Sequence, residues 1–268
     1  MTESYVMCDP DDIEFTFDWY EGLLTELREY GFESVPFEGG IHDGEMALRH
    51  DIDLSPRKAL AMGRIEADLG LSATYFFLVT SPLYNVLDGP NRQIIERLTS
   101  LGHRIGLHFN THQYWRSEPR TGSIRQCIEE NQAVLNIAAP EITRTVSFHC
   151  PPEWVLDRTI PGVDHTYEPA RFSQIAYSAD SGQRWREQRV LDEPLPDRLQ
   201  LLTHPGLWGA DDEHYIQRVT SELQTALDRT ERYVSRELLH DRFDVVDYPS
   251  DDISQWMPSG RLPAVKPD

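Results

Sequence analysis

The sequence predicts an α/β fold in which right-handed βα units surround a mostly parallel sheet. Short apolar runs alternate with amphipathic stretches of about ten residues or more, the patterns typical of strands and helices. Polar residues stand at or just after the ends of the predicted strands: Asp51, His108, His149, Asp180 and His204. Ligands of α/β folds bind at the carboxyl ends of the strands, so these residues indicate one site. The length of 268 residues fits a single domain over residues 1–268.

The first elements are predicted from spacing and from helix-boundary residues. Trp and Leu at helical spacing predict a helix over residues 14–31. Two consecutive glycines then break the chain before a short apolar run at 46–48, which we expect to be a buried strand. A second helix is expected over 56–69, because Ser55 is a suitable N-cap and a proline follows it. Gly70 ends this helix.

The middle of the chain continues the alternation. β-Branched and aromatic residues at 74–79 predict the next strand. A helix is expected over 92–101 and is stopped by Gly102, after which residues 104–108 have the composition of a strand. Another helix is predicted over 122–138.

The remaining elements are less regular. Residues 145–148 predict a strand, and the region 150–195 is rich in Pro and Gly and should be irregular, with a short strand near 174–177. A strand follows at 198–203. A long charged helix with an apolar stripe is expected over 211–240.

The composition excludes some partners and suggests an environment. A formal net charge of -20 argues against binding to nucleic-acid phosphates or to anionic membrane surfaces. Of the 25 basic residues, only Lys58 and Lys266 are lysine. An acidic chain with so little lysine is typical of proteins from a salt-saturated cytoplasm, where salt screens the surface charge. The alternative is an ordinary acidic protein from a GC-rich genome, which also favours arginine.

Cysteine usage and hydropathy indicate a cytoplasmic protein. The 3 cysteines are an odd number without CxxC spacing, so we expect no disulfide framework. The first residues have neither a basic nor an apolar segment of the kind found in secretory signals. No run approaches the roughly 18 apolar residues needed to span a bilayer, so we expect no membrane insertion.

Two separated motifs have the composition of a divalent-metal site. Asp53 offers an oxygen ligand, and His108 and His112 offer imidazole nitrogens that would share one face if a helix followed His108. Three ligands leave positions open for water and substrate, as in catalytic sites. Such a donor set suits Zn²⁺ best, with Co²⁺, Mn²⁺ or Fe²⁺ as alternatives. Asp51 is placed to be a general base, and His204 could supply the general acid.

The ordered motifs resemble the polysaccharide deacetylase family, the NodB-homology or carbohydrate esterase 4-like group. Residues 49–53 match its first motif, an Asp pair, in an Asp-x-Asp form. His108 and His112 match its His-x-x-x-His motif. The resemblance implies a distorted (β/α) barrel, often seven-stranded, with a motif core at 45–210 and the helices 14–31 and 211–240 as additions. It also implies Asp51 as base and Asp53, His108 and His112 as metal ligands.

The later motifs match the family less evenly. His149 stands where the family has an arginine that orients the base, and Pro152 stands where a tyrosine N–H helps to bind the oxyanion. Proline has no N–H to donate. Asp180, in the loosely matched fourth motif, is expected to orient His149. The fifth motif is well matched, with His204 as acid. By resemblance, Leu202 would line the acyl pocket. Trp185 lies near the motifs and could stack on a sugar ring or fill the core, and Pro151 is the third expected substrate-binding residue.

The sequence therefore predicts a metal-dependent hydrolase of C–N amide bonds. Its substrate would be an amino sugar or a glycan precursor that loses an acetyl or formyl group. Two alternatives remain open: a hydrolase of a linear or cyclic amide unrelated to sugars, and a catalytically silent barrel that binds a glycan or a partner. The sequence does not indicate an oligomeric state.

Overall fold

A computed structural model describes residues 4–239 of the chain. The chain divides into two compact units, Met1–Arg218 and Val219–Asp268. The first unit contains the sheet, its helices and all of the predicted site residues. The described part of the second continues helix α5 (Tyr215–Tyr233) and ends in a π-helical segment, Val234–Leu239. The predicted single domain over 1–268 stays a prediction, and the expected helix end at His240 lies outside the described residues.

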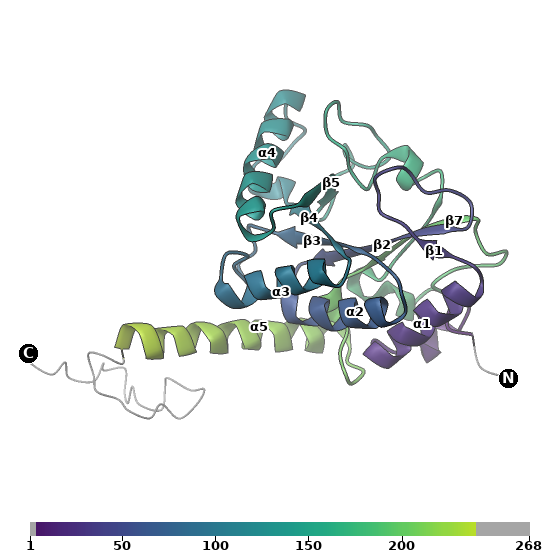
Figure 1. Cartoon of the computed structure of the whole chain (residues 1–268), viewed down its shortest axis with the longest axis horizontal. Coiled ribbons are helices and arrows are strands. Elements are labelled where there is room, and N and C mark those ends of the chain that lie inside the picture. The colour runs from purple at the N-terminus through teal and green to yellow at the C-terminus, as the bar shows by residue number, and fades with distance from the viewer. Residues whose placement is uncertain (1–3, 240–268) are drawn as a thin grey trace, which may run out of the picture. The chain divides into compact units, whose positions relative to one another are not determined.

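The core of the first unit is a seven-stranded parallel sheet with the order β5-β4-β3-β2-β7-β6 and a short β1 beside β2 (Figure 1). Its strands are β1 (Glu33–Ser34), β2 (Glu45–Ile52), β3 (Thr74–Leu78), β4 (Arg104–Phe109), β5 (Ile142–Phe148), β6 (Ala176–Ala179) and β7 (Arg198–Thr203). Among the described residues, no pairing joins β5 to β6, so the sheet does not close. The expected fold, a distorted seven-stranded (β/α) barrel, is confirmed in this open form.

The helices cover the sheet much as their sequence patterns predict. They are α1 (Phe17–Glu29), α2 (Pro56–Asp68), α3 (Gly89–Ser100) and α4 (Thr121–Ala138). α1, α2 and α3 lie in a row along the sheet, and α4 covers its β4–β5 end (Figure 1). The N-cap of α1 is Thr16, whose side chain accepts a hydrogen bond from the Trp19 N–H.

The predicted boundaries hold with local differences. The strand expected at 46–48 is β2, Glu45–Ile52, so Asp51 lies within the strand. The short strand expected near 174–177 is β6, Ala176–Ala179. Ser55 precedes α2 as expected but makes no side-chain capping bond.

A buried polar cluster lies between the sheet and α2. Glu66 of α2 is fully buried and accepts hydrogen bonds from the hydroxyls of Tyr20 and Tyr75, each at 2.6 Å. His50 Nε2 lies 2.6 Å from Glu66 Oε1, and His50 Nδ1 lies 2.7 Å from the Thr203 hydroxyl on β7. Burial would raise the pKa of Glu66, but the facing His50 holds it below its usual value. This cluster ties α2 and β7 to the outer face of β2.

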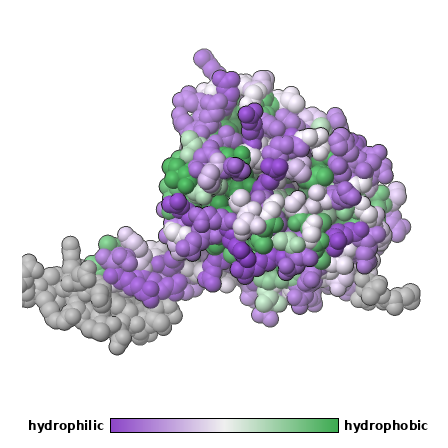
Figure 2. Space-filling model, in the orientation of Figure 1, coloured by the Kyte–Doolittle hydropathy of each residue, from purple (hydrophilic) through white to green (hydrophobic). Residues whose placement is uncertain are grey.

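On the face drawn in Figure 2, hydrophilic residues are interspersed with smaller hydrophobic patches. Within residues 4–239, no helix combines the length and the apolar character that crossing a membrane requires.

Candidate active site

The predicted site residues gather at one edge of the sheet because the strands are parallel. Each stands at, or directly after, the carboxyl end of its strand: Asp51 and Asp53 with β2, His108 with β4, His149 with β5, Asp180 with β6 and His204 with β7. β2 lies between β3 and β7, so the Asp51–Asp53 segment is central at this edge. The pattern of strand-end residues seen in the sequence therefore corresponds to one location.

Three of these side chains form a cluster that could hold a metal ion: Asp53, His108 and His149. Asp53 Oδ1 lies 3.1 Å from His108 Nε2 and 2.9 Å from His149 Nδ1, and the two ring nitrogens are 3.2 Å apart. Although these atoms are close, Asp53 Oδ1 is a buried oxygen without a well-formed hydrogen bond among the described residues. A divalent cation would satisfy it, and one oxygen with two nitrogens suits zinc and similar metals.

The protonation states of Asp53 and His149 affect the binding of a cation in this cluster. Burial would raise the pKa of Asp53, but the His108 and His149 rings hold it well below its usual range. Burial would lower the pKa of His149, but the Asp53 carboxylate outweighs this and raises it to about 10. Without a metal, His149 is therefore protonated at neutral pH, and metal binding would release that proton.

Ser147 fixes the tautomer of His108. Its hydroxyl lies 2.7 Å from Arg49 Nη2, 2.8 Å from Asp51 Oδ1 and 2.9 Å from His108 Nδ1. A hydroxyl has one hydrogen to donate, and arginine can only donate. The ionised Asp51 takes the serine hydrogen, so His108 Nδ1–H must donate to Ser147. The lone pair of His108 Nε2 is then directed at the Asp53 cluster, as a metal ligand requires.

His112 lies apart from this cluster. It is exposed, and its Nε2 lies 2.8 Å from the Cys150 carbonyl oxygen. The sequence placed both histidines on one helical face, but His108 belongs to β4, and the chain then enters a short 3-10 helix, Thr111–Gln113. The Asn110 side chain accepts a hydrogen bond from the His112 N–H at its start. The four-residue spacing therefore does not bring the two rings together, and His149 occupies the third position.

Asp51, the predicted base, is buried beside the cluster. The Arg49 guanidinium binds its carboxylate at 2.7 Å to Oδ2 and 3.1 Å to Oδ1. Asp51 Oδ2 lies 3.7 Å from His108 Nδ1. Burial would raise the pKa of Asp51, but Arg49 and His108 hold it below its usual value, so the carboxylate is ionised at neutral pH.

Asp180 contacts His204, whereas the sequence analysis expected it to orient His149. Its Oδ1 lies 2.6 Å from His204 Nδ1, and its Oδ2 accepts the His204 backbone N–H at 2.9 Å and the Trp208 indole N–H at 2.8 Å. Burial would lower the pKa of His204, but the fully buried Asp180 carboxylate raises it to about 9. His204 Nε2 is left facing the cluster, 3.9 Å from Asp53 Oδ2.

Neither a family model nor a curated protein matches the sequence. Among solved structures, a peptidoglycan N-acetylglucosamine deacetylase is 16% identical with a TM-score of 0.42, covering 78% of this chain and 91% of that chain. A family 4 acetyl xylan esterase from Clostridium thermocellum, in complex with a cobalt ion, is 16% identical with a TM-score of 0.37, covering 72% and 84%. A CE4 family pseudoenzyme from Bacillus anthracis is 12% identical with a TM-score of 0.39, covering 70% and 60%.

The three predicted substrate-binding residues have different surroundings. Leu202 is buried in β7 in register with Arg49, on the sheet face that carries Asp51. Pro151 is half-buried directly after His149 and Cys150. Trp185 is fully buried against Phe15, Trp19 and Trp208, and its indole N–H donates to Ser178 Oγ at 3.0 Å. Trp185 is therefore packed in the core in this structure.

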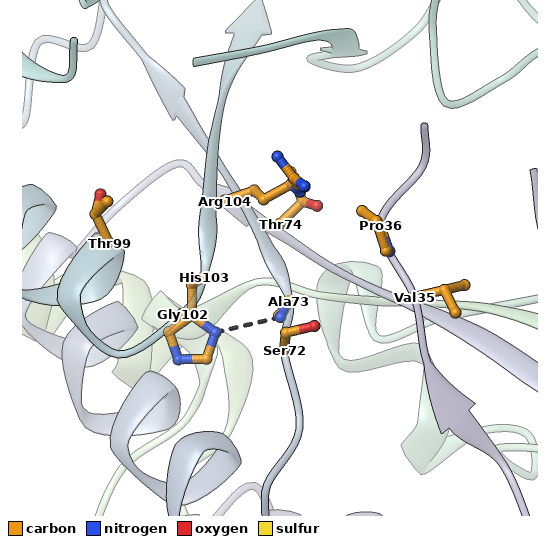
Figure 3. A pocket seen from close by; sticks show the side chains of 9 residues that line it. All are labelled: Val35, Pro36, Ser72, Ala73, Thr74, Thr99, Gly102, His103 and Arg104. Carbon is orange, nitrogen blue, oxygen red and sulfur yellow. Dashed lines mark hydrogen bonds between the residues drawn. The ribbon is translucent and has the colours of Figure 1, made fainter. Parts of the chain in front are cut away.

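A pocket of about 240 Å³ lies at the opposite edge of the sheet, at the amino ends of β3 and β4 (Figure 3). His103 forms part of its wall, and its Nδ1 accepts the Ala73 N–H at 3.2 Å (Figure 3). Its Nε2 must then carry the proton and donate to the Gly63 carbonyl at 2.7 Å. Both ring nitrogens are thus used in holding α2 and the β3 entrance together, which makes His103 a structural residue.

Proposed function

We propose that this protein is a metal-dependent hydrolase that removes an acetyl or formyl group from the amide nitrogen of an amino sugar or glycan precursor. The observation that carries the proposal is the gathering of three kinds of group at one sheet edge. The candidate metal cluster contacts both of the others: His108 lies 3.7 Å from the ionised Asp51 carboxylate, and Asp53 lies 3.9 Å from His204, which pairs with Asp180. A base, a cation site and an acid within reach of one another are what amide hydrolysis needs.

The proposed division of labour follows from the protonation states. Asp53, His108 and His149 would hold the ion, with His112 the alternative that the sequence pattern favours. A bound divalent ion would polarise the amide carbonyl and make water more acidic. Asp51, ionised, would accept the proton of the attacking water. His204, whose pKa of about 9 keeps it protonated at neutral pH, would donate a proton to the departing amine nitrogen. Asp180 would keep its ring oriented.

The metal and the compartment are part of the proposal. Zinc is our first choice for one carboxylate and two imidazoles, with cobalt, manganese or iron as alternatives. The three cysteines are free, and with the acidic, lysine-poor composition this supports a reducing, salt-rich cytoplasm. A cytoplasmic hydrolase would meet nucleotide-linked or lipid-linked sugar precursors before mature wall polymers.

The test is release of acetate or formate by metal-loaded protein. Substrates should include N-acetylglucosamine oligosaccharides, a nucleotide-linked N-acetyl sugar and a small linear amide. We expect Asp51→Asn and His204→Ala each to lower kcat about 10²-fold to 10⁴-fold, the range of general acid–base catalysis. Asp43→Asn is a matched control, because that carboxylate is 85% exposed and pairs only loosely with Arg198.

The outcome also separates the alternatives. Hydrolysis of the small amide without hydrolysis of any sugar would support an enzyme with a non-sugar substrate. A protein that binds neither zinc nor cobalt and releases no acid would support a silent binding barrel. Pro152 supports that last alternative, since it offers no N–H where the family pattern has an oxyanion donor.

A further inference from the structure

The inner face of the sheet is layered, and its middle layer is polar. Ala47, Arg49 and Asp51 of β2 all point to this face, because successive residues of a strand point to opposite faces. Nearest the amino ends, Ala47 packs with Phe37 and Phe76 in a small apolar cluster. Arg49 comes next, and Asp51 reaches the site edge. Barrel interiors are usually filled by branched apolar side chains at such a middle level, so a charged residue there is unusual.

Arg49 is completely buried and is held by three other segments. Its Nη1 donates to Gln200 Oε1 on β7 at 3.1 Å. Its Nη2 lies 2.7 Å from the Ser147 hydroxyl on β5 and 2.8 Å from the Tyr167 hydroxyl. The guanidinium carbon also lies 4.5 Å from the centre of the Tyr167 ring, in cation–π contact. These contacts leave the guanidinium one orientation, with its Nε–Nη2 edge facing Asp51.

This arrangement restricts how Asp51 can accept a proton. Asp51 Oδ1 accepts from Arg49 Nε and from the Ser147 hydroxyl, which uses both of its lone pairs. Asp51 Oδ2 accepts from Arg49 Nη2 and keeps one lone pair. That oxygen is the one that lies 3.7 Å from His108 Nδ1. The carboxylate therefore has one open acceptor position, on the oxygen nearer the metal-binding residue.

We propose that Arg49 is the positioning residue for Asp51, fixing the carboxylate so that Oδ2 alone is presented to the reacting proton. The inference rests on the proposed function, in which Asp51 is the base. Burial of an ion pair is a weak source of stability, because desolvation offsets the attraction between the charges. A bidentate fork does supply orientation, and orientation is what a base needs. Among the described residues, Arg49 makes no hydrogen bond or ion pair with Asp53, His108 or His149, so it would act through Asp51.

The first test is kinetic. Arg49→Met should lower kcat about a hundredfold, the size of effect that a misplacement of about 1 Å produces, while KM and the bound metal stay within about twofold of the wild type. Arg49→Lys keeps the charge without the fork and should recover part of the loss. Arg171→Met is the matched control: Arg171 is another largely buried arginine, near the Phe37 ring and paired with Asp164, and makes no contact with Asp51. The kcat of Arg171→Met should stay within about twofold of the wild-type value.

Two results would overturn the inference in this assay. One is a kcat for Arg49→Met within twofold of the wild type. The other is an equal loss of kcat in Arg49→Met and Arg171→Met, because that pattern means general destabilisation. Should Arg49→Met fail to fold, Tyr167→Phe carries the test, since it keeps the ring under the guanidinium and removes one hydrogen bond. It should lower kcat about threefold to tenfold at unchanged KM, and an unchanged kcat counts against the proposal.

A crystal structure of Arg49→Met gives a readout that needs no substrate. The Asp51 carboxylate should rotate away from its place 2.8 Å from the Ser147 hydroxyl. A carboxylate that stays in place sinks the inference even if kcat falls. If the wild type hydrolyses none of the substrates, the proposed function fails, and this crystallographic comparison still decides whether Arg49 orients Asp51.

Discussion

The Ser147 hydroxyl and His108 Nδ1 lie 2.9 Å apart, and this contact connects the predicted base to the candidate metal cluster. The same hydroxyl binds Asp51 Oδ1 at 2.8 Å. One small side chain thus sets both the tautomer of a candidate ligand and the position of the base. Ser147 was not among the site residues that the sequence predicted.

We expect Ser147→Ala to weaken metal binding about 10-fold to 100-fold, because the His108 ring loses the acceptor that orients it. Titration calorimetry with Zn²⁺ measures this directly. Ser178→Ala is the control: that serine is also buried, but it holds Trp185 and the Val190 carbonyl on the other face of the sheet. Equal zinc affinity for the wild type and Ser147→Ala would contradict the tautomer assignment.

The two histidines that compete for the third ligand position can be separated. His149→Ala should lower zinc affinity by more than roughly a hundredfold, since loss of a ligand exceeds the effect of an outer partner. His112→Ala should change it by less than about tenfold, because His112 binds the Cys150 carbonyl. A cobalt-substituted protein offers a second readout in its absorption spectrum. The reverse ranking of the two variants would restore His112 as the ligand that the motif predicts.

The pH dependence of kcat should report His204. Its pKa is raised to about 9, so the protonated acid persists until pH rises through that value, and kcat should fall above about pH 9. Asp180→Asn removes the charge that raises this pKa, and the alkaline limb should move to lower pH. A pH–rate profile of both proteins measures the shift. An alkaline limb that is identical in the two would show that His204 is not the acid, or that Asp180 does not set its pKa.

Glu66 should contribute to stability in a pH-dependent way. Its pKa is lowered from the usual 4.5 on folding, so its contribution is fully present above about pH 4.5 and is lost as pH falls through the folded pKa. We expect Glu66→Gln to lower the free energy of unfolding by about 1–3 kcal/mol at pH 7, measured by urea denaturation. The difference should shrink in acid. Glu129→Gln, at an exposed i,i+4 pair with Arg125, should have almost no effect at either pH.

The fold was predictable because its elements carry strong local signals. The apolar runs at β3 and β7 and the stripes of α1 and α2 are explained by periodicity alone, and their structural bounds match within a few residues. The clustering of strand-end polar residues also followed from one rule about parallel sheets. Register was not predictable: that Asp180 meets His204 depends on β6 pairing with β7, which no local pattern encodes.

The site was less predictable where backbone detail decides which side chain points inward. The His108–His112 motif suggests a helical pair, but the first histidine ends a strand and the second lies on a 3-10 turn. His149 follows Ser147 by two residues after β5, so strand alternation directs both to the cluster. Arg49 and Asp51 have the same two-residue relationship, and alternation could have paired them from the sequence.

The pairing of β2 with β7 has a consequence for how the site comes into being during synthesis. Asp53 follows β2, His108 lies near the end of β4, and His149 follows β5; with β3, these strands are consecutive neighbours in the sheet. His204 follows β7, which pairs on the other side of β2 and is the last strand of the sheet to be synthesised. The three candidate metal ligands are therefore all synthesised before His204, the proposed proton donor. The proposed acid is the last of these groups to join the site, and the proposed activity needs β7 paired beside β2.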